Sequence, residues 1–265
     1  MSKKNMYMKK MDTQGKVNSK RSFNQNSVNV LKYLRKEKVY DGFESIYDIG
    51  AGFAYSSKYF ADLGKNVTAV DYNVSLENLE FAKVNNFKFI QGDFYNLDIK
   101  DNSVEAIWSS HALEHSTDLL KVLHEFRRTL KTGGTLILNV PTYNLGLVLS
   151  GHYNIGFNPG QLIYLLVLSG FEFQDGYALN IDNNTVIVCR KTAEQKTIFS
   201  TNSNANILNY INMFPSPIVD YCKKYNSIYF PSYIKLENGK SKRIAYKGGI
   251  FHRILRFILR KLYLF

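Results

Sequence analysis

Short apolar runs alternate with helical stretches along most of this chain, and this alternation constrains the fold more than any other feature. The runs, each rich in Val, Ile or aromatic residues, are 45–49, 66–70, 87–91, 104–109 and 134–140. Helical stretches lie near 24–38, 55–64, 75–84 and 117–130. Strands of this composition are typical of a parallel sheet that is buried on both faces. We therefore predict an α/β fold, with an open, mostly parallel sheet and helices on both faces.

A later helix and a hairpin complete the predicted sheet. The helix covers about 159–169 and stops at Gly170, and strands at 171–177 and 184–190 follow it. They bring the expected sheet to seven strands. From about residue 192 the composition becomes Asn- and Ser-rich, as in linkers. We expect four parts: a basic flexible N-terminus (1–21), the α/β domain (22–192), a linker with an aromatic-rich extension (193–248) and a basic amphipathic C-terminal helix (249–265).

The net charge of +12 is concentrated at the two ends of the chain. Residues 1–21 carry +6 and residues 238–265 carry +8, which leaves −2 for residues 22–237. The charge therefore disfavours a basic nucleic-acid groove on the domain and indicates tails that meet something anionic. In 249–265, three Arg residues share one helical face, and two interpretations stay open. The helix lies on anionic lipid at the membrane surface, or it docks on its own domain or on a second subunit.

Composition also limits the compartment and the chemistry. No run of about 18 apolar residues predicts a membrane-spanning helix, and the Lys-rich start lacks the apolar stretch of a secretory signal. Cys189 lies in an apolar run and is predicted to be a buried thiol, while Cys222 shows no metal-type spacing with it. We expect a cytoplasmic protein without disulfides and without a metal site.

A glycine turn follows the first predicted strand, in the segment 46–52 (Ile-Tyr-Asp-Ile-Gly-Ala-Gly). Glycine lets a backbone approach a ligand closely, since it has no Cβ. A dinucleotide-binding turn needs a further glycine at position 55, which is Tyr55 here. The turn therefore favours a nucleoside-bearing cofactor that has no pyrophosphate.

Two carboxylates follow at the ends of the next two strands. Asp71 comes 21 residues after Gly50, where a carboxylate accepts hydrogen bonds from both hydroxyls of an unphosphorylated ribose. The alternative for Asp71 is a helix N-cap. Asp93 is placed to hold the exocyclic amine of adenine while Phe94 packs beside the base. Alone, the Gly-Asp pair at 92–93 is an ordinary turn, but its order and spacing after the other two carboxylates favour a binding role.

Five segments in this order resemble class I S-adenosylmethionine-dependent methyltransferases, especially the small-molecule enzymes related to those of ubiquinone biosynthesis. They are 48–52 (Asp-Ile-Gly-Ala-Gly), 70–71 (Val-Asp), 92–94 (Gly-Asp-Phe), 112–115 (Ala-Leu-Glu-His) and 130–138 (Leu-Lys-Thr-Gly-Gly-Thr-Leu-Ile-Leu). The resemblance covers about residues 40–190. It implies a Rossmann-like fold, S-adenosyl-L-methionine as the cofactor and S-adenosyl-L-homocysteine as its product.

The resemblance also implies which residues border the cofactor. Asp48 and the glycine turn border its methionine part, Asp71 its ribose, and Asp93 with Phe94 its adenine. The family's usual third glycine is Ala54 here, a small residue that still permits close approach. The expected cofactor residues are Asp48, Gly50, Ala51, Gly52, Asp71, Tyr72, Asp93, Phe94 and Ser109.

The reacting side is expected after the fourth and fifth strands. An alcohol acceptor needs a base, and His serves near neutral pH. His111 lies nearest the end of the fourth strand and is the first candidate, whereas His115 matches a family position that is more often structural. His152 and Tyr153 follow the fifth strand, where similar enzymes contact the acceptor. For each of these histidines, a structural role and a catalytic role weigh about equally.

The expected reaction is methyl transfer to a hydroxyl or amine of a small polar acceptor. The His-Tyr pair at 152–153 followed by Gly-Phe at 170–171 loosely resembles methyltransferases of bacterial surface-polysaccharide synthesis, so a sugar, nucleotide-sugar or phosphorylated precursor is favoured. One alternative is a lipid-linked or quinone-like acceptor at the inner face of the membrane, which the amphipathic tail suits. Another is an RNA-binding or RNA-methylating protein that uses its basic tails. A segment of the Asp-Pro-Pro-Tyr kind after the fourth strand is absent, which disfavours methylation of a flipped base.

Overall fold

The computed structural model describes residues 25–141, 159–181, 184–193, 213–214, 235–237 and 240–242. Several sequence predictions lie outside these residues. They are the basic N-terminus, most of the linker and extension, the C-terminal amphipathic helix, His152, Tyr153 and Cys222.

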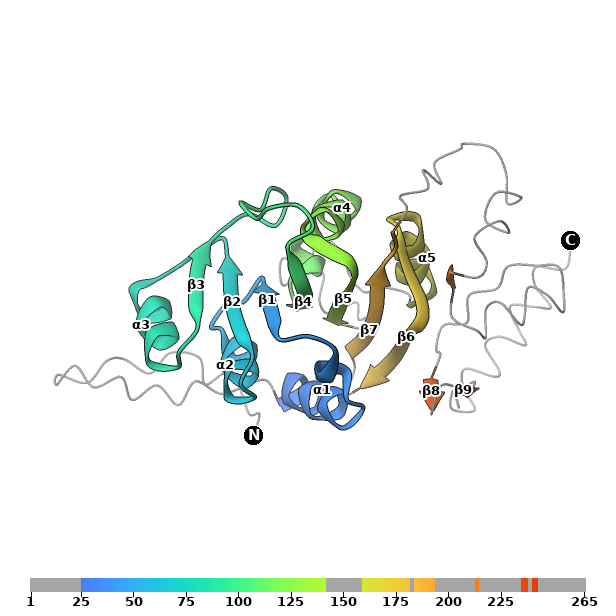
Figure 1. Ribbon diagram of the computed structural model, residues 1–265, viewed down its shortest axis with the longest axis horizontal. Coiled ribbons are helices and arrows are strands. Elements are labelled where there is room, and N and C mark those ends of the chain that lie inside the picture. Colours follow the sequence, from blue (N-terminus) through green and yellow to red (C-terminus); the bar gives the residue numbers. More distant parts are fainter. Residues whose placement is uncertain are drawn as a thin grey trace, which may run out of the picture.

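Seven strands form one twisted sheet that runs across the molecule (Figure 1). They are β1 (Ser45–Ile49), β2 (Asn66–Asp71), β3 (Lys88–Gln91), β4 (Val104–Ser110), β5 (Leu130–Pro141), β6 (Phe171–Ile181) and β7 (Asn184–Lys191). Their order is β3-β2-β1-β4-β5-β7-β6. The first five strands pair in parallel, whereas β7 pairs antiparallel with both β5 and β6. The predicted seven-stranded, mostly parallel sheet with a closing hairpin is confirmed.

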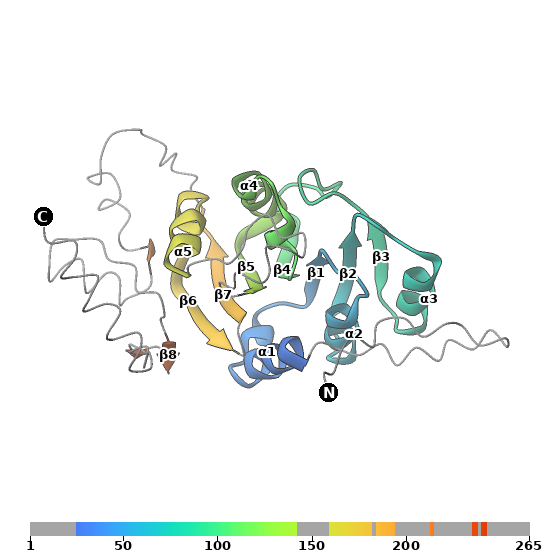
Figure 2. The same cartoon turned by 180° about the vertical axis from the view of Figure 1, so that it is seen from behind.

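Helices cover the sheet on both faces (Figures 1 and 2). They are α1 (Gln25–Lys36), α2 (Tyr55–Asp62), α3 (Leu76–Val84), α4 (Leu119–Thr129) and α5 (Pro159–Leu168), with short 3-10 turns η1 (Val39–Gly42) and η2 (Leu113–His115). A small separate hairpin, β8 (Lys235–Glu237) with β9 (Lys240–Lys242), also lies within the described residues. None of the helices that the structure describes is long and apolar enough to cross a bilayer.

The central strands are apolar throughout because each contributes side chains to two hydrophobic cores, one on either face of the sheet. In β5, Leu136 and Leu138 pack into the core under α4 and α5, whereas Ile137 between them packs into the core under α1, α2 and α3. Successive side chains of a strand point to opposite faces of the sheet, so both faces must be covered. Cys189 on β7 is fully buried in the first of these cores, and burial raises the pKa of its thiol. Its prediction as a buried thiol is confirmed.

The structure differs from the predicted elements mainly at β5 and β6. β5 begins at Leu130, where α4 was expected to end, because Leu130 already pairs with Val104 of β4. The register then shifts before Thr135, over a stretch that contains two glycines. β6 likewise continues past residue 177, with a register shift between Glu172 and Tyr177. Irregular pairing of this kind breaks the apolar periodicity from which strand ends are predicted.

The parallel strands bring their carboxyl ends to one edge of the sheet. β1 lies between β2 and β4, so the chain moves outward to β3 on one side and returns to β4 on the other. In open α/β sheets, ligands bind at such a point, in the crevice outside the carboxyl ends. The sheet therefore places the ends of β1, β2, β3 and β4 side by side, where the sequence predicts the cofactor.

Candidate active site

The glycine turn after β1 is held by β2 and faces open space. The N–H groups of Gly50 and Ala51 both donate to the carbonyl of Val70, at 2.9 and 3.0 Å. Gly50 has φ +77° and Gly52 has φ +53°, a left-handed backbone that favours glycine. A Cβ on Gly50 would lie 2.4 Å from the Cβ of Ala112, whereas a Cβ on Gly52 would meet nothing within 4 Å. Gly50 is therefore needed for packing, and Gly52 leaves room for a ligand.

Ala54 stands where related turns have a third glycine, and it also adopts φ +56°. Its side chain is completely buried, so it packs beneath the turn. The residue is the N-cap of α2, which begins at Tyr55. Because the Ala54 side chain is buried, the departure from glycine leaves the open side of the turn unobstructed.

Asp71 is fixed by two backbone donors. Its Oδ2 accepts from the N–H of Gly52 at 2.8 Å, and its Oδ1 accepts from the N–H of Asn73 at 3.0 Å. Each carboxylate oxygen accepts more than one hydrogen bond, so both keep capacity for a ligand hydroxyl. The alternative role as a helix N-cap is wrong, because Ser75 caps α3 by accepting from the N–H of Asn78.

Asp48 is a buried carboxyl directly below the turn. Only 2% of the residue is exposed, and its Oδ2 accepts a 2.6 Å hydrogen bond from the Ser57 hydroxyl at the start of α2. Burial raises the pKa of Asp48 from 3.8 to about 7, and the hydrogen bonds from Ser57 offset only part of that rise. Asp48 is thus poised to ionise when a cation binds next to it.

Asp93 and Phe94 lie one strand further along the same edge. Gly92 donates to the carbonyl of Asp71 at 2.9 Å, which brings the loop after β3 against the end of β2. The Oδ1 of Asp93 accepts from the N–H of Tyr95 at 2.9 Å, so Asp93 does form the local turn that was its alternative. The residue is nonetheless exposed, and Phe94 beside it is half-buried.

Tyr72 and Ser109 differ in how accessible they are to a cofactor. Tyr72 directly follows β2 in the sequence and is 68% exposed. Ser109 is almost fully buried, and its hydroxyl donates to the carbonyl of Ile49 at 2.9 Å, which ties the end of β4 to the end of β1. A contact of Ser109 with the cofactor stays a prediction, and the structure gives it a supporting position beneath the turn.

His111 follows β4 in a left-handed conformation, with φ +52°. Its N–H donates to the carbonyl of Asn139 on β5 at 2.9 Å. Its Nδ1 lies 3.3 Å from Oε1 of Glu114, a completely buried side chain in η2. Its Nε2 is shielded from solvent and has no hydrogen-bond partner among the described residues.

A cavity of about 170 Å³ joins the glycine turn to His111. It brings together four residues that the sequence predicted and four that it did not: Ser27, Asp48, Gly50, Ala51, Tyr55, Ser56, Ser110 and His111. Ser110 lies between the predicted residues Ser109 and His111, and the pair at 55–56 closely follows the glycine turn. Their positions in the sequence could therefore have identified them as site residues. Ser27 comes from α1, and no sequence pattern connected that helix with the site.

Comparison with known proteins agrees with this geometry. Residues 47–138 match a family model described as a methyltransferase domain. A demethylmenaquinone methyltransferase from Paenarthrobacter aurescens is 33% identical over 95 residues, which are 36% of this chain and 38% of that protein. A malonyl-[acyl-carrier protein] O-methyltransferase from Pectobacterium atrosepticum is 31% identical over 93 residues, 34% of this chain and 36% of that protein.

The chain is therefore similar to S-adenosylmethionine-dependent methyltransferases over residues 47–138. The phosphoethanolamine N-methyltransferase 2 of Haemonchus contortus, solved with S-adenosyl-L-methionine, shares the fold. Its TM-score is 0.51 at 18% identity, over 64% of this chain and 53% of that one. The chain spans well under half the length of the two sequence relatives named above.

The residues of the methyltransferase domain fit its cofactor, S-adenosyl-L-methionine. The open position above Gly52 is a space that any larger side chain would fill. Next to it, Asp71 presents a fixed carboxylate, and Asp48 supplies a buried acidic group. An open glycine, a fixed carboxylate and a buried acid suit a ligand that carries hydroxyl groups and a positive charge.

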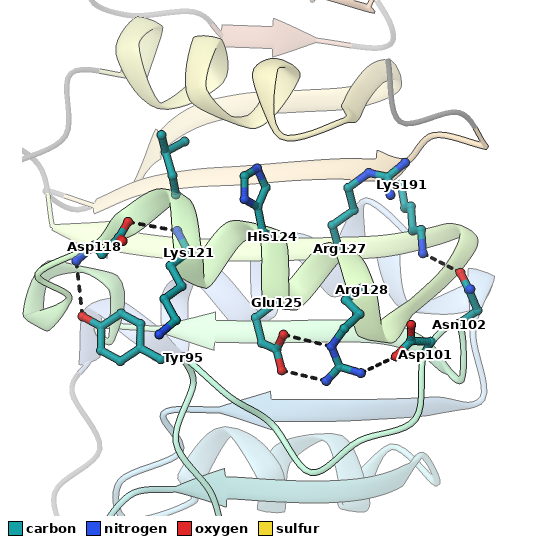
Figure 3. A pocket seen from close by; sticks show the side chains of 11 residues that line it. Tyr95, Asp101, Asn102, Asp118, Lys121, His124, Glu125, Arg127, Arg128 and Lys191 are labelled. Atoms are coloured by element: carbon teal, nitrogen blue, oxygen red, sulfur yellow. Dashed lines mark hydrogen bonds and ion pairs between the residues drawn. The ribbon is translucent and has the colours of Figure 1, made fainter. Parts of the chain in front are cut away.

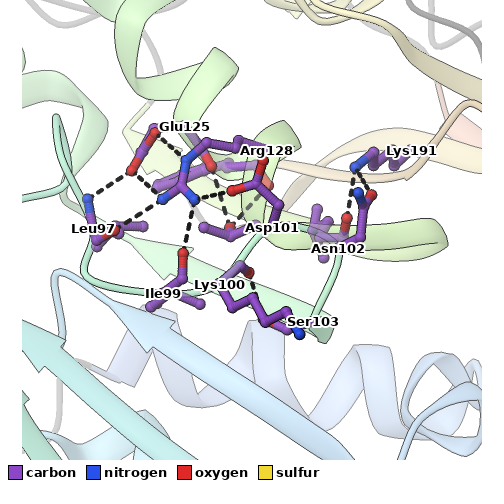
Figure 4. Close-up of polar contacts among 12 residues, drawn as sticks. Leu97, Ile99, Lys100, Asp101, Asn102, Ser103, Glu125, Arg128 and Lys191 are labelled. Carbon is purple, nitrogen blue, oxygen red and sulfur yellow. Dashed lines mark hydrogen bonds and ion pairs between the residues drawn. The ribbon is translucent and has the colours of Figure 1, made fainter.

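A larger cavity of about 730 Å³ lies beside α4, apart from the methyltransferase motifs (Figure 3). Its most connected group is Arg128, which pairs with Glu125 and Asp101 and donates to the carbonyls of Leu97 and Ile99 at 2.9 and 2.7 Å (Figure 4). These bonds anchor the chain between β3 and β4 to α4. Despite its size we assign this cavity a structural role, because none of the glycine-turn or strand-end carboxylate residues lines it.

Proposed function

We propose that this protein transfers a methyl group from S-adenosyl-L-methionine to a hydroxyl or amine of a small polar acceptor. The observation that carries the proposal is the contact between the two halves of the predicted cofactor site. Asp71 at the end of β2 accepts from the N–H of Gly52 after β1 at 2.8 Å. The Asp71 carboxylate, to which we assign the ribose, is thereby bonded to the open glycine turn at the carboxyl edge of the sheet.

The cofactor supplies an electrophilic methyl group, and the protein has to bind, orient and shield it. Asp71 takes the ribose hydroxyls, and Asp93 with Phe94 and Tyr72 borders the adenine. Asp48 faces the methionine portion, where an ammonium group would favour its ionised form. Because methyl transfer is an in-line displacement, much of the acceleration comes from holding the acceptor in line with the methyl group.

The acceptor side is proposed to be the His111 end of the cavity, next to the glycine-turn end that takes the methionine portion of the cofactor. Its lining residues include four that bear hydroxyls, Ser27, Tyr55, Ser56 and Ser110, together with His111. Such a lining suits a polar acceptor, because hydroxyl groups both donate and accept hydrogen bonds. His111 serves as the base, and we assign His152 and Tyr153 to acceptor contact from their place in the sequence after β5.

For the acceptor itself we favour a sugar, nucleotide-sugar or phosphorylated precursor of a bacterial surface polysaccharide, methylated in the cytoplasm or at the inner face of the membrane. The polar cavity supports this class over a purely apolar acceptor. A second candidate is a lipid-linked or quinone-like acceptor, because one relative is named a demethylmenaquinone methyltransferase. The basic amphipathic segment 249–265 would then hold the enzyme at the lipid surface.

RNA methylation or RNA binding is the weakest of the original alternatives. Residues 22–237 carry a net charge of −2, which gives the domain no electrostatic attraction for phosphates. If the isolated tails rather than the domain bound RNA strongly, the catalytic assignment would be unaffected.

The test is a screen for S-adenosyl-L-homocysteine formation with three acceptor panels: sugars and nucleotide-sugars, quinols and lipid-linked sugars in detergent, and RNA. We expect turnover in the first panel. With the active acceptor, His111→Ala should lower kcat by about 100-fold or more, the usual contribution of a general base. His124→Ala on α4 is the matched control and should leave kcat unchanged. Turnover that is insensitive to His111→Ala would remove His111 as the base, and turnover in the quinol panel alone would select the second candidate.

A further inference from the structure

Asn78 on α3 is a buried polar residue in a helix, where packing alone would favour an apolar side chain. Only 6% of the residue is exposed, and Asn favours caps and turns over helix interiors. A buried amide needs hydrogen-bonding partners, so its place in α3 calls for a specific contact. One such contact lies outside the helix: Nδ2 of Asn78 donates to the carbonyl of Gly52 at 2.7 Å.

The Asn78 amide is oriented by Ser75, the N-cap of α3. The Ser75 hydroxyl accepts from the N–H of Asn78 at 3.2 Å and donates to Oδ1 of the same side chain. Because this hydroxyl bonds the amide oxygen, the NH₂ group is the end that meets Gly52. The start of α3 therefore presents a fixed donor to the glycine turn.

Gly52 is held on both sides by groups that follow it in the chain. Its N–H donates to Oδ2 of Asp71 at 2.8 Å, and its carbonyl accepts from Asn78 at 2.7 Å. It has φ +53°, and a Cβ placed on it would meet nothing within 4 Å. A glycine has the largest conformational freedom of any residue, and no side chain packs it in place. The order of Gly52 therefore depends on these two backbone bonds.

We propose that Asn78 is a positioning residue, which fixes the Gly52 peptide in the orientation that S-adenosyl-L-methionine meets. The inference rests on the proposed function and deepens it, because it adds α3 to the elements that build the cofactor site. A site that is ordered before its ligand arrives binds more tightly, since binding need not order it. Asn78 acts through Gly52, so its effect falls on cofactor affinity and not on the methyl-transfer step.

Calorimetric titration of S-adenosyl-L-methionine into the full-length protein measures this effect. Asn78→Asp keeps the size of the side chain and an oxygen for Ser75, but it replaces the donor to Gly52 by an acceptor. The loss of one hydrogen bond should raise Kd by about 5–10-fold. Asn85→Asp is the matched control, because Nδ2 of Asn85 donates to the carbonyl of Phe81 at 2.7 Å at the other end of α3. The control should keep Kd within about twofold of wild type.

Two further measurements separate positioning from a purely structural role. The ¹⁵N order parameter of Gly52, assigned by the loss of its signal in Gly52→Ala, should be lower in cofactor-free Asn78→Asp than in wild type. Saturation with the cofactor should remove that difference. With an active acceptor, Asn78→Asp should raise KM for the cofactor and leave kcat within about twofold. Asn78→Ala removes the donor without adding a charge, and it should give the same results if Asn78→Asp folds poorly.

The outcomes for Asn78 and for the proposed function can be told apart. If wild type does not bind S-adenosyl-L-methionine, the proposed function is wrong and the inference fails with it. If wild type binds and neither Asn78→Asp nor Asn78→Ala changes Kd, the inference alone is wrong. An equal rise of Kd in Asn85→Asp would also overturn it, because the effect would then come from a general loosening of α3.

Discussion

Replacing Asp48 by Asn tests whether burial really governs the chemistry of the carboxyl below the glycine turn. The side chain is 2% exposed, and its pKa is raised from 3.8 to about 7. Since the folded-state value lies above the unfolded one, the folded protein binds more protons between about pH 4 and pH 7. The free energy of unfolding therefore falls as the pH rises through that window.

The size of the effect follows from the shift. At 1.36 kcal/mol per pKa unit, the ionisation of Asp48 costs the folded state roughly 4 kcal/mol by pH 8. Asp48→Asn removes that cost and keeps an oxygen that accepts from the Ser57 hydroxyl. Relative to wild type, the variant should therefore gain roughly 4 kcal/mol of stability between pH 4 and pH 8.

Urea unfolding of the cofactor-free protein at pH 4, 6 and 8 measures this difference. Asp62→Asn is the matched control, since that carboxylate is exposed and, among the described residues, pairs with Lys58. Its difference from wild type should not change with pH by more than a few tenths of a kcal/mol. An equal difference between wild type and Asp48→Asn at pH 4 and pH 8 would refute the burial argument.

Three further predictions concern the turn, the α4 anchor and the buried thiol. Gly50→Ala should destabilise the fold by about 2 kcal/mol or more, because the new Cβ clashes with Ala112. Gly52→Ala should cost only about 1 kcal/mol of stability but should weaken cofactor binding; chemical denaturation measures the first effect and calorimetric titration the second. Arg128→Met should lower the free energy of unfolding by about 2 kcal/mol, because it leaves two partly buried carbonyls unpaired; an unchanged urea midpoint would contradict this. Cys189 should react with a maleimide only on the timescale of unfolding, and fast labelling in a Cys222→Ser background would show that it is not buried.

Much of the fold was predictable because apolar periodicity is a strong signal in strands buried on both faces. The runs at 45–49 and 66–70 correspond almost residue for residue to β1 and β2. The start of β5 was mistaken by several residues, because a register shift places two glycines inside the strand. Glycines read from sequence alone predict an end to regular structure, and only the pairing with β4 shows that the strand continues.

The cofactor side of the site was predictable, and the acceptor side was only partly so. The motif residues lie at the ends of consecutive strands, as Asp48, Gly52 and Asp71 do. Because the sheet places these strand ends side by side, residues that are far apart in the sequence come close together. Ser27 had no such signal, because α1 reaches the cavity through tertiary packing and not through its place in the strand–turn–helix order. The short distance between Glu114 and His111 was also missed, since it depends on the left-handed turn at His111.

Calorimetric titration of S-adenosyl-L-methionine into wild type and Asp71→Ala tests the central claim most directly. Two charge-assisted hydrogen bonds to the ribose are together worth about 3 kcal/mol, so Kd should rise by roughly 100-fold in the variant. Asp101→Ala, a carboxylate of the α4 anchor, should leave Kd unchanged. Saturable wild-type binding that Asp71→Ala abolishes or weakens in this way is the predicted result. No binding to wild type, or equal affinities for wild type and Asp71→Ala, would contradict the assignment of this edge of the sheet as the cofactor site.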